Sequence, residues 1–155
     1  MTPYADPQGR FRIEYPTGWQ VRPQAAAGST AFYLDDPDEG IAVTVQTQGT
    51  VSGRVEGGAL TPIVFRQLKQ RYPDLTLVVT SSQLLAGGAQ QSEFTAQWTN
   101  RWAQRMRGTG RIVSVPRDGN TAYLYVAGQA QELVFPGVEP ILLRMLDSFS
   151  EIPKG

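Results

Sequence analysis

The tripeptide Asp118–Gly119–Asn120 and the long strand-like stretches around it constrain the fold more than any other feature of this sequence. Asp-Gly and Asn-Gly type pairs between alternating apolar segments are a strong β-hairpin signal, because the tight turn needs positive φ angles. One strand is expected at about Arg105–Val115, a second begins after Asn120, and another is expected at about Gln91–Thr99. The centre of the chain is therefore predicted to be an antiparallel meander.

Shorter strands precede this meander. Period-two alternation in Phe11–Tyr15 predicts a half-buried strand, and Pro16 with Gly18 predicts a tight hairpin or corner that leads into Trp19. The crowded segment Gly9–Val21 is therefore interpreted as a structural corner, not as a binding site. Three further strands are predicted, the last of them buried: Thr30–Leu34, Ile41–Thr47 and Leu75–Leu85.

Two helices are expected. Thr61 is a natural N-cap, Pro62 suits a first helical position, and Pro73 would end the helix, so one helix is predicted over 62–72. The Gly-rich stretch before it, Gly49–Gly58, is interpreted as a mobile surface loop. The C-terminal helix is marked by an apolar stripe with helical spacing: Val138, Ile141, Leu142, Met145, Leu146 and Phe149.

The length of 155 residues favours a single domain over 1–155, which can bury about 68 to 70% of the surface of its unfolded chain. The 16 glycines and 11 prolines favour short strands and tight turns over helix bundles. The predicted class is α+β: an α/β/α sandwich with a central, twisted antiparallel sheet of about six to eight strands and two main helices.

Composition excludes several classes of function. The 14 basic and 14 acidic residues cancel, so nucleic acid is not an expected partner. The absence of His and Cys excludes Ser-His-Asp and Cys-His catalysis as well as the common zinc sites, and no nucleotide-binding or cofactor motif occurs. No apolar run is long enough to insert into a membrane, and no signal peptide is evident, although a removed signal or anchor would leave the same sequence.

The acidic turn at residues 35–40 is a weak candidate for a metal site through Asp35, Asp36 and Asp38. Read as an EF-hand loop it fails, because Gly40 and Thr47 stand where ligands are needed. Ordinary turn chemistry is the favoured interpretation, and no metal or cofactor is assigned.

An arginine-rich segment is the main candidate for a binding site. Arg105, Arg107 and Arg111 share strand parity and are expected on one face of the sheet, near Arg101 and Trp102 at the end of a hairpin. Arg and Trp are enriched in binding hot spots, so this patch would suit an acidic protein surface or a ligand carboxylate. In the alternative interpretation the arginines pair with Glu93 and neighbouring acids, and Trp98 lies in the core.

Several of these elements together resemble the PsbP/DcrB-like superfamily. They are the segment "FRIEYPTGW", the meander, the "YLYV" strand and the final helix ending in "MLDSF". The superfamily includes the extrinsic P-subunit of photosystem II, DcrB-type bacterial lipoproteins and a Ran-binding import factor. The resemblance implies an α/β/α sandwich whose members mostly bind other proteins, and it favours an extracytoplasmic location. It implies no catalytic residues.

Two functions are kept open. The first is a non-catalytic protein-interaction or assembly module with a protein partner. The second is a small-molecule or lipid-binding module with an apolar pocket between the sheet and the C-terminal helix, near Leu142 and Met145.

Overall fold

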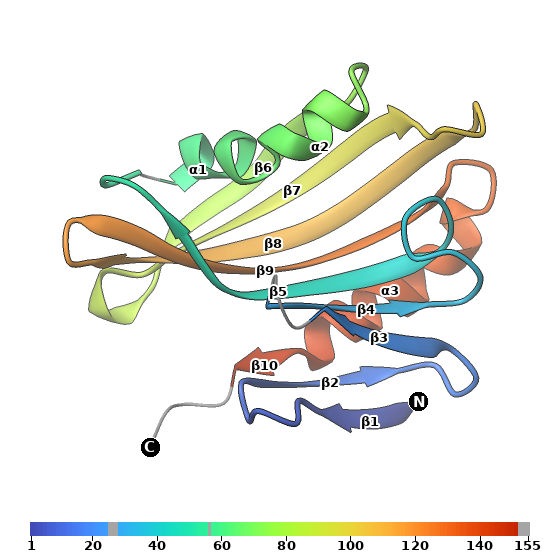
Figure 1. The fold of residues 1–155 in the computed structure, drawn as a ribbon, viewed down its shortest axis with the longest axis horizontal. Helices are drawn as coiled ribbons and strands as arrows, with labels where there is room; N and C mark the ends of the chain where they lie inside the picture. The colour runs from blue at the N-terminus through green and yellow to red at the C-terminus, as the bar shows by residue number, and fades with distance from the viewer. Residues whose placement is uncertain (25–27, 56, 152–155) are drawn as a thin grey trace.

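The computed structural model describes residues 1–24, 28–55 and 57–151, and it contains two antiparallel sheets (Figure 1). The larger sheet has seven strands in the order β3-β4-β5-β9-β8-β7-β6. Their bounds are β3 Gln20–Gln24, β4 Ser29–Tyr33, β5 Ala42–Val51, β6 Thr76–Leu84, β7 Gln90–Thr99, β8 Arg105–Arg117 and β9 Asn120–Gln131. The smaller sheet has the order β1-β2-β10, with β1 Thr2–Ala5, β2 Phe11–Tyr15 and β10 Ser150–Glu151.

Helices cover both faces of the larger sheet, as the predicted α/β/α sandwich requires (Figure 1). On one face lie α1 (Gly57–Val64) and α2 (Arg66–Arg71), which follow β5 in the chain. On the other face lies α3 (Phe135–Ser148). A short 3-10 turn, η2 (Ala86–Gly88), joins β6 to β7. The predicted α+β class is confirmed.

The strand register decides which residues meet which helix layer. Val43 and Val45 of β5 and Val126 of β9 face α3 and belong to the main core. Thr44, one position along, pairs with Ala127 and faces the opposite side, towards α1 and α2. The central strands β5 and β9 therefore have one side in the α3 core and the other side on the face that carries α1 and α2.

The main core fills the space between the sheet and α3. Leu142 and Met145 are completely buried there, and Gly128 of β9 lets α3 approach closely, since a Cβ on Gly128 would lie 3.2 Å from Leu142 Cδ2. The alternative pocket predicted at this interface is therefore wrong, because packed side chains occupy its position. The buried members of this cluster are Phe11, Ile13, Phe32, Val43, Val45, Val126, Ala130, Phe135, Leu142, Met145 and Leu146.

A second, smaller core lies under α2 on the other face. It contains Trp98, which is buried against the ring of Tyr72 with 6.3 Å between ring centroids. Beside it, Phe65 packs on Phe94 and Tyr125, with centroid distances of 5.1 and 5.0 Å. This aromatic cluster anchors the link between α1 and α2 to the sheet.

The first helical region differs from the prediction. Instead of one helix over 62–72 there are two, separated at Phe65. Thr61 is not an N-cap: it lies inside α1, fully buried, and its hydroxyl has no hydrogen-bond partner among the described residues. The helix breaks where the ring of Phe65 reaches the sheet to pack on Phe94 and Tyr125.

The stretch Gly49–Gly58 is also more ordered than predicted in its described part. β5 continues to Val51, and Gly49 lies directly under the ring of Tyr123, where any side chain would overlap it. Beyond the strand, Thr121 Oγ1 donates to the carbonyl of Gly53 and accepts from the backbone N–H of Val55. Glu56 lies outside the described residues.

The segment Gly9–Val21 forms a corner, as predicted, and not a hairpin. β2 belongs to the smaller sheet and β3 to the larger one, so the chain changes sheets between Tyr15 and Gln20. Within the turn, the backbone N–H of Trp19 donates to Pro16 and Gly18 has a φ of 97°. The segment therefore shapes the fold.

The strand predicted at Leu75–Leu85 exists as β6, but it is not buried. It forms one edge of the larger sheet and pairs with β7 alone, and most of its side chains are exposed. No helix in the described part of the chain is long and apolar enough to cross a membrane.

Candidate interaction site

The acidic turn between β4 and β5 is closed by Asp36. Its Oδ1 accepts the backbone N–H groups of Asp38 at 2.9 Å and Glu39 at 3.1 Å, and its carbonyl accepts that of Gly40. The hydrogen bond from Asp38 is the main cause that lowers the pKa of the Asp36 carboxyl. This is the turn chemistry that the sequence favoured, and the described residues contain no group of three side chains suited to hold a metal ion.

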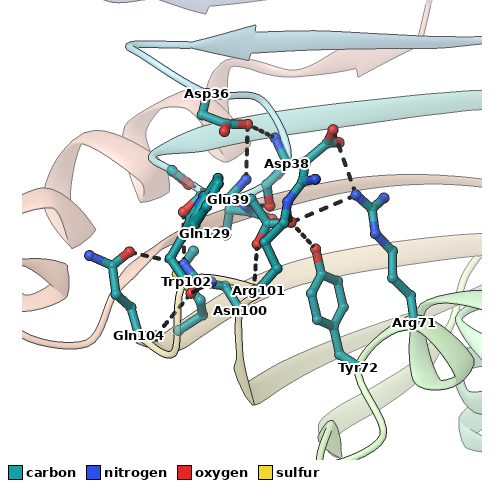
Figure 2. A network of polar contacts seen from close by, with 12 residues as sticks. Asp36, Asp38, Glu39, Arg71, Tyr72, Asn100, Arg101, Trp102, Gln104 and Gln129 are labelled. Carbon is teal, nitrogen blue, oxygen red and sulfur yellow. Dashed lines mark hydrogen bonds and ion pairs between the residues drawn. The ribbon is translucent and has the colours of Figure 1, made fainter.

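Glu39, at the end of this turn, is the centre of a polar network (Figure 2). Its side chain is 1% exposed and accepts a 2.6 Å hydrogen bond from the Tyr72 hydroxyl. Arg101 contributes its backbone N–H at 3.2 Å and its Nε at 3.3 Å, and Arg71 approaches to 3.6 Å. The network joins the acidic turn, the end of α2 and the hairpin between β7 and β8.

The hairpin itself is held by Asn100. Its Oδ1 accepts the backbone N–H groups of Trp102 at 3.0 Å and Gln104 at 2.9 Å, and its Nδ2 donates to the carbonyl of Glu39 at 3.1 Å. Trp102 at the tip is 63% exposed, and the Arg101 guanidinium lies 5.4 Å from the centre of its ring. A large aromatic side chain therefore stands in solvent on a turn with a fixed backbone.

The three strand arginines lie on one face, as their parity predicts, and Arg107 and Arg111 contact α3. Arg105 bonds Asp74 at 3.1 Å, Arg107 lies 5.2 Å from the ring centre of Phe135, and Arg111 bonds Asp147 at 3.0 Å. Glu93, named in the alternative interpretation, is opposite Arg111 in register, but the ion pair of Arg111 is with Asp147.

Trp98 takes no part in this patch, because it is buried on the opposite face of the sheet. Arg101, Trp102 and Arg105 lie together at the hairpin, whereas Arg107 and Arg111 follow along β8. The structure thus separates the predicted residues into a hairpin group and a strand group.

Two exposed apolar residues next to the hairpin escaped the sequence analysis. Leu133 is 97% exposed and Val134 is 43% exposed, in the turn between β9 and α3. A backbone hydrogen bond of 2.8 Å from Glu132 to Arg105 fastens this turn to the start of β8. The turn and the hairpin lie at the same end of the molecule (Figure 1). We call the residues Arg101, Trp102, Arg105, Leu133 and Val134 the hairpin surface.

Tyr72 makes the network sensitive to alkaline pH. Burial, followed by the hydrogen bond to Glu39, raises the pKa of Tyr72 from 10.0 to about 12. Because the folded-state pKa is higher than the unfolded one, this stabilisation is complete below pH 10 and is lost as the pH rises towards 12.

Between pH 10 and 12, we therefore expect the free energy of unfolding of the wild type to fall by about 2 kcal/mol more than that of Tyr72→Phe. Urea unfolding at several pH values measures the difference. Tyr125, whose pKa burial also raises to about 12, contributes to both proteins equally and cancels in the comparison. Parallel stability curves for the two proteins over this range would contradict the expectation.

Comparison with known proteins establishes the class of fold. The chain has a PsbP/DcrB-like fold, shown by solved structures that match it over nearly its whole length at low sequence identity. No protein-family model matches the sequence, and no curated protein matches it either.

Three of these solved structures illustrate the range of proteins with this fold. LpqN of Mycobacterium tuberculosis, involved in cell envelope biogenesis, is 14% identical, with 98% of this chain and 90% of that one covered and a TM-score of 0.57. PsbP (CyanoP) of the cyanobacterium Synechocystis is 15% identical, with 96% and 91% covered and a TM-score of 0.51. The Ran-binding protein Mog1p of Saccharomyces cerevisiae is 10% identical, with 97% and 94% covered and a TM-score of 0.58.

Proposed function

We propose that this chain is a non-catalytic protein-interaction or assembly module that binds an acidic surface of a protein partner through the hairpin surface. The observation that carries the proposal is Trp102, a tryptophan 63% exposed on a hairpin whose backbone is fixed by Asn100. Exposed Trp is unusual outside binding sites, and Trp and Arg are the residues most enriched among interface hot spots.

The geometry favours binding because the hairpin loses little conformational entropy when a partner binds. The Asn100 hydrogen bonds hold the hairpin backbone before a partner arrives, and the nearby guanidinium of Arg101 restricts the Trp102 ring. Rigid contact residues lose less entropy on association than mobile ones. Leu133 and Val134 extend the apolar area beside the ring.

The charges of the surface are available to a partner. Arg101 and Arg105 have side chains 57% and 46% exposed, and the ion pair of Arg105 with Asp74 lies at the surface. Exposed ion pairs of this kind contribute about 0 to 1 kcal/mol, so an acidic partner can replace Asp74 at small cost. The proposed partner therefore presents acidic residues around an apolar spot.

The comparisons support this class of function in general terms. Mog1p is described as a Ran-binding protein, and LpqN takes part in cell envelope biogenesis. By analogy we propose a protein partner and an extracytoplasmic location. Fractionation of cells that express the native gene tests the location, and recovery of the protein in the cytoplasm alone would contradict it.

The test compares partner capture by the wild type, by Trp102→Ala and by Arg105→Ala. We expect both variants to keep the wild-type melting temperature and to lose at least tenfold in affinity for the captured partner, with the arginine variant also losing salt dependence. Leu84→Ala is the matched control, because Leu84 is 76% exposed on the edge strand β6. Equal capture by wild type and both variants would contradict the proposal.

A further inference from the structure

A cleft of about 590 Å³ lies on the face of the larger sheet that carries α1 and α2. These helices stand over the β6–β8 side of the sheet (Figure 1), and the cleft extends from Phe65 and Leu68 across β9, β5 and β4. Its volume falls in the range of about 300 to 1,000 Å³ that is typical of small-molecule sites. It lies on the opposite face from the disproved pocket at α3.

Part of the floor of this cleft is a row of small side chains on three adjacent strands, Ala31, Thr44 and Ala127. Arg22 pairs with Ala31 on the next strand, so it extends this row just beyond the residues that line the cleft. Adjacent strands are about 4.8 Å apart, so the row from Arg22 to Ala127 is about 14 Å long. Short side chains between longer neighbours make this row a trough.

Two of the three residues on each side of the trough have long side chains. In the next register row on one side lie Tyr33, Ala42 and Gln129, and on the other side lie Ser29, Gln46 and Tyr125. Gln46, Tyr125 and Gln129 line the cleft together with Ala31, Thr44 and Ala127. A ligand in the trough is therefore confined laterally and must be elongated.

The inner end of the trough is apolar, and aromatic rings stand across the row of Ala127. Ala127 pairs with Gly110, and the Phe94 ring covers Gly110, since a Cβ there would lie 2.7 Å from Phe94 Cζ. The ring of Phe65 packs on Phe94 and completes this wall. The inner end therefore suits a hydrocarbon terminus and offers no counter-charge to an ionic one.

The outer end of the trough is positively charged. Arg22 is exposed and forms no ion pair with any described residue, unlike Arg71 at the rim, which lies 3.9 Å from Asp38. Because Arg71 is paired with Asp38 and Arg22 has no ion pair within the described part of the chain, the open end carries one net positive charge. A guanidinium with free N–H groups is a good partner for a carboxylate.

We propose that the trough binds an amphipathic monocarboxylate, with its apolar body along Ala31, Thr44 and Ala127 and its carboxylate at Arg22. The apolar terminus contacts Phe65. The charge at one end and the aromatic wall at the other fix the direction of the ligand, and the length of the row selects a chain over a compact ring.

Titration calorimetry of the whole chain with decanoate, 1-decanol and 2-naphthoate tests this proposal. We expect decanoate to bind with a dissociation constant below about 1 mM, and 2-naphthoate to bind more weakly. Arg22→Gln should weaken decanoate about three- to tenfold and change 1-decanol less than about twofold. Arg12→Gln, which changes an exposed arginine on β2, is the matched control and should change neither.

Ala127→Leu should abolish binding of both decanoate and 1-decanol, because the larger side chain fills the trough. If Ala127→Leu lowers the melting temperature, Thr44→Leu is used in its place, and we expect it to abolish binding in the same way. The absence of decanoate binding to the wild type, unchanged binding in both filled variants, or equal loss of decanoate and 1-decanol in Arg22→Gln would each overturn the proposal. Tighter binding of 2-naphthoate than of decanoate would overturn the inference that the trough selects an elongated ligand.

Discussion

Glu39→Ala is expected to lower the free energy of unfolding by about 3 kcal/mol. The substitution removes the acceptor of the buried Tyr72 hydroxyl and of the Arg101 backbone N–H, and it removes the anion between Arg71 and Arg101. Buried donors that lose their acceptor cost more than the bond contributed, so the effect exceeds that of a surface ion pair. Urea unfolding at pH 7 measures it.

The same substitution should loosen the hairpin that carries Trp102. Hydrogen exchange of the Trp102 and Gln104 amides should become faster in Glu39→Ala, since the acidic turn no longer holds the hairpin through Arg101. Glu14→Ala is the matched control, because Glu14 is an exposed residue of β2. A loss of stability below about 1 kcal/mol in Glu39→Ala would show that the network is not structural.

Leu142→Ala is expected to lower the free energy of unfolding by about 3 to 4 kcal/mol. Leu142 is completely buried and packs on Gly128 of β9, so its removal leaves a cavity that Gly128, which has no side chain, cannot fill. Leu143→Ala provides a control of identical chemistry on the next residue, which is 43% exposed. Thermal and urea unfolding of the two variants give the comparison.

We expect Leu143→Ala to change the stability by less than about 1 kcal/mol. Similar losses in the two variants would contradict the assignment of one face of α3 to the core. A small loss in Leu142→Ala alone would mean that the interface between α3 and the sheet relaxes and is not tightly packed.

Local patterns predicted the centre of the fold well. The turn at Asp118 and Gly119 has φ angles of 52° and 78°, as the Asp-Gly signal requires. The apolar spacing of the last helix identified Leu142, Met145 and Leu146, although Ile141 of the same stripe is 39% exposed because it lies at the margin of the packed face. These features depend on residues close in the sequence.

The features that local patterns missed depend on tertiary partners. β-branched residues in Leu75–Leu85 indicate a strand but not its place in the sheet, and β6 is an edge. The helix break at Phe65 arises because its ring packs on Phe94 and Tyr125, which are distant in sequence. Propensity therefore gave the element types, whereas long-range packing set their ends and exposure.

The candidate site was predicted in part for the same reason. Strand parity placed Arg105, Arg107 and Arg111 on one face, because a strand alternates its side chains. The burial of Glu39 could not be foreseen, since its partners come from α2 and a hairpin about sixty residues further along the chain. Leu133 and Val134 had a signal, two apolar residues directly before the final helix and outside its stripe.

The most direct test of the proposed function is site-specific photocrosslinking from position 102. A photoreactive phenylalanine analogue replaces Trp102 in one protein and Leu84 in another, because both side chains are largely exposed and they lie on different elements. A protein partner that crosslinks from position 102 and not from position 84 is the predicted result, and excess unlabelled wild type should suppress it. Crosslinks to that partner from position 84 and none from position 102 would contradict binding through the hairpin surface.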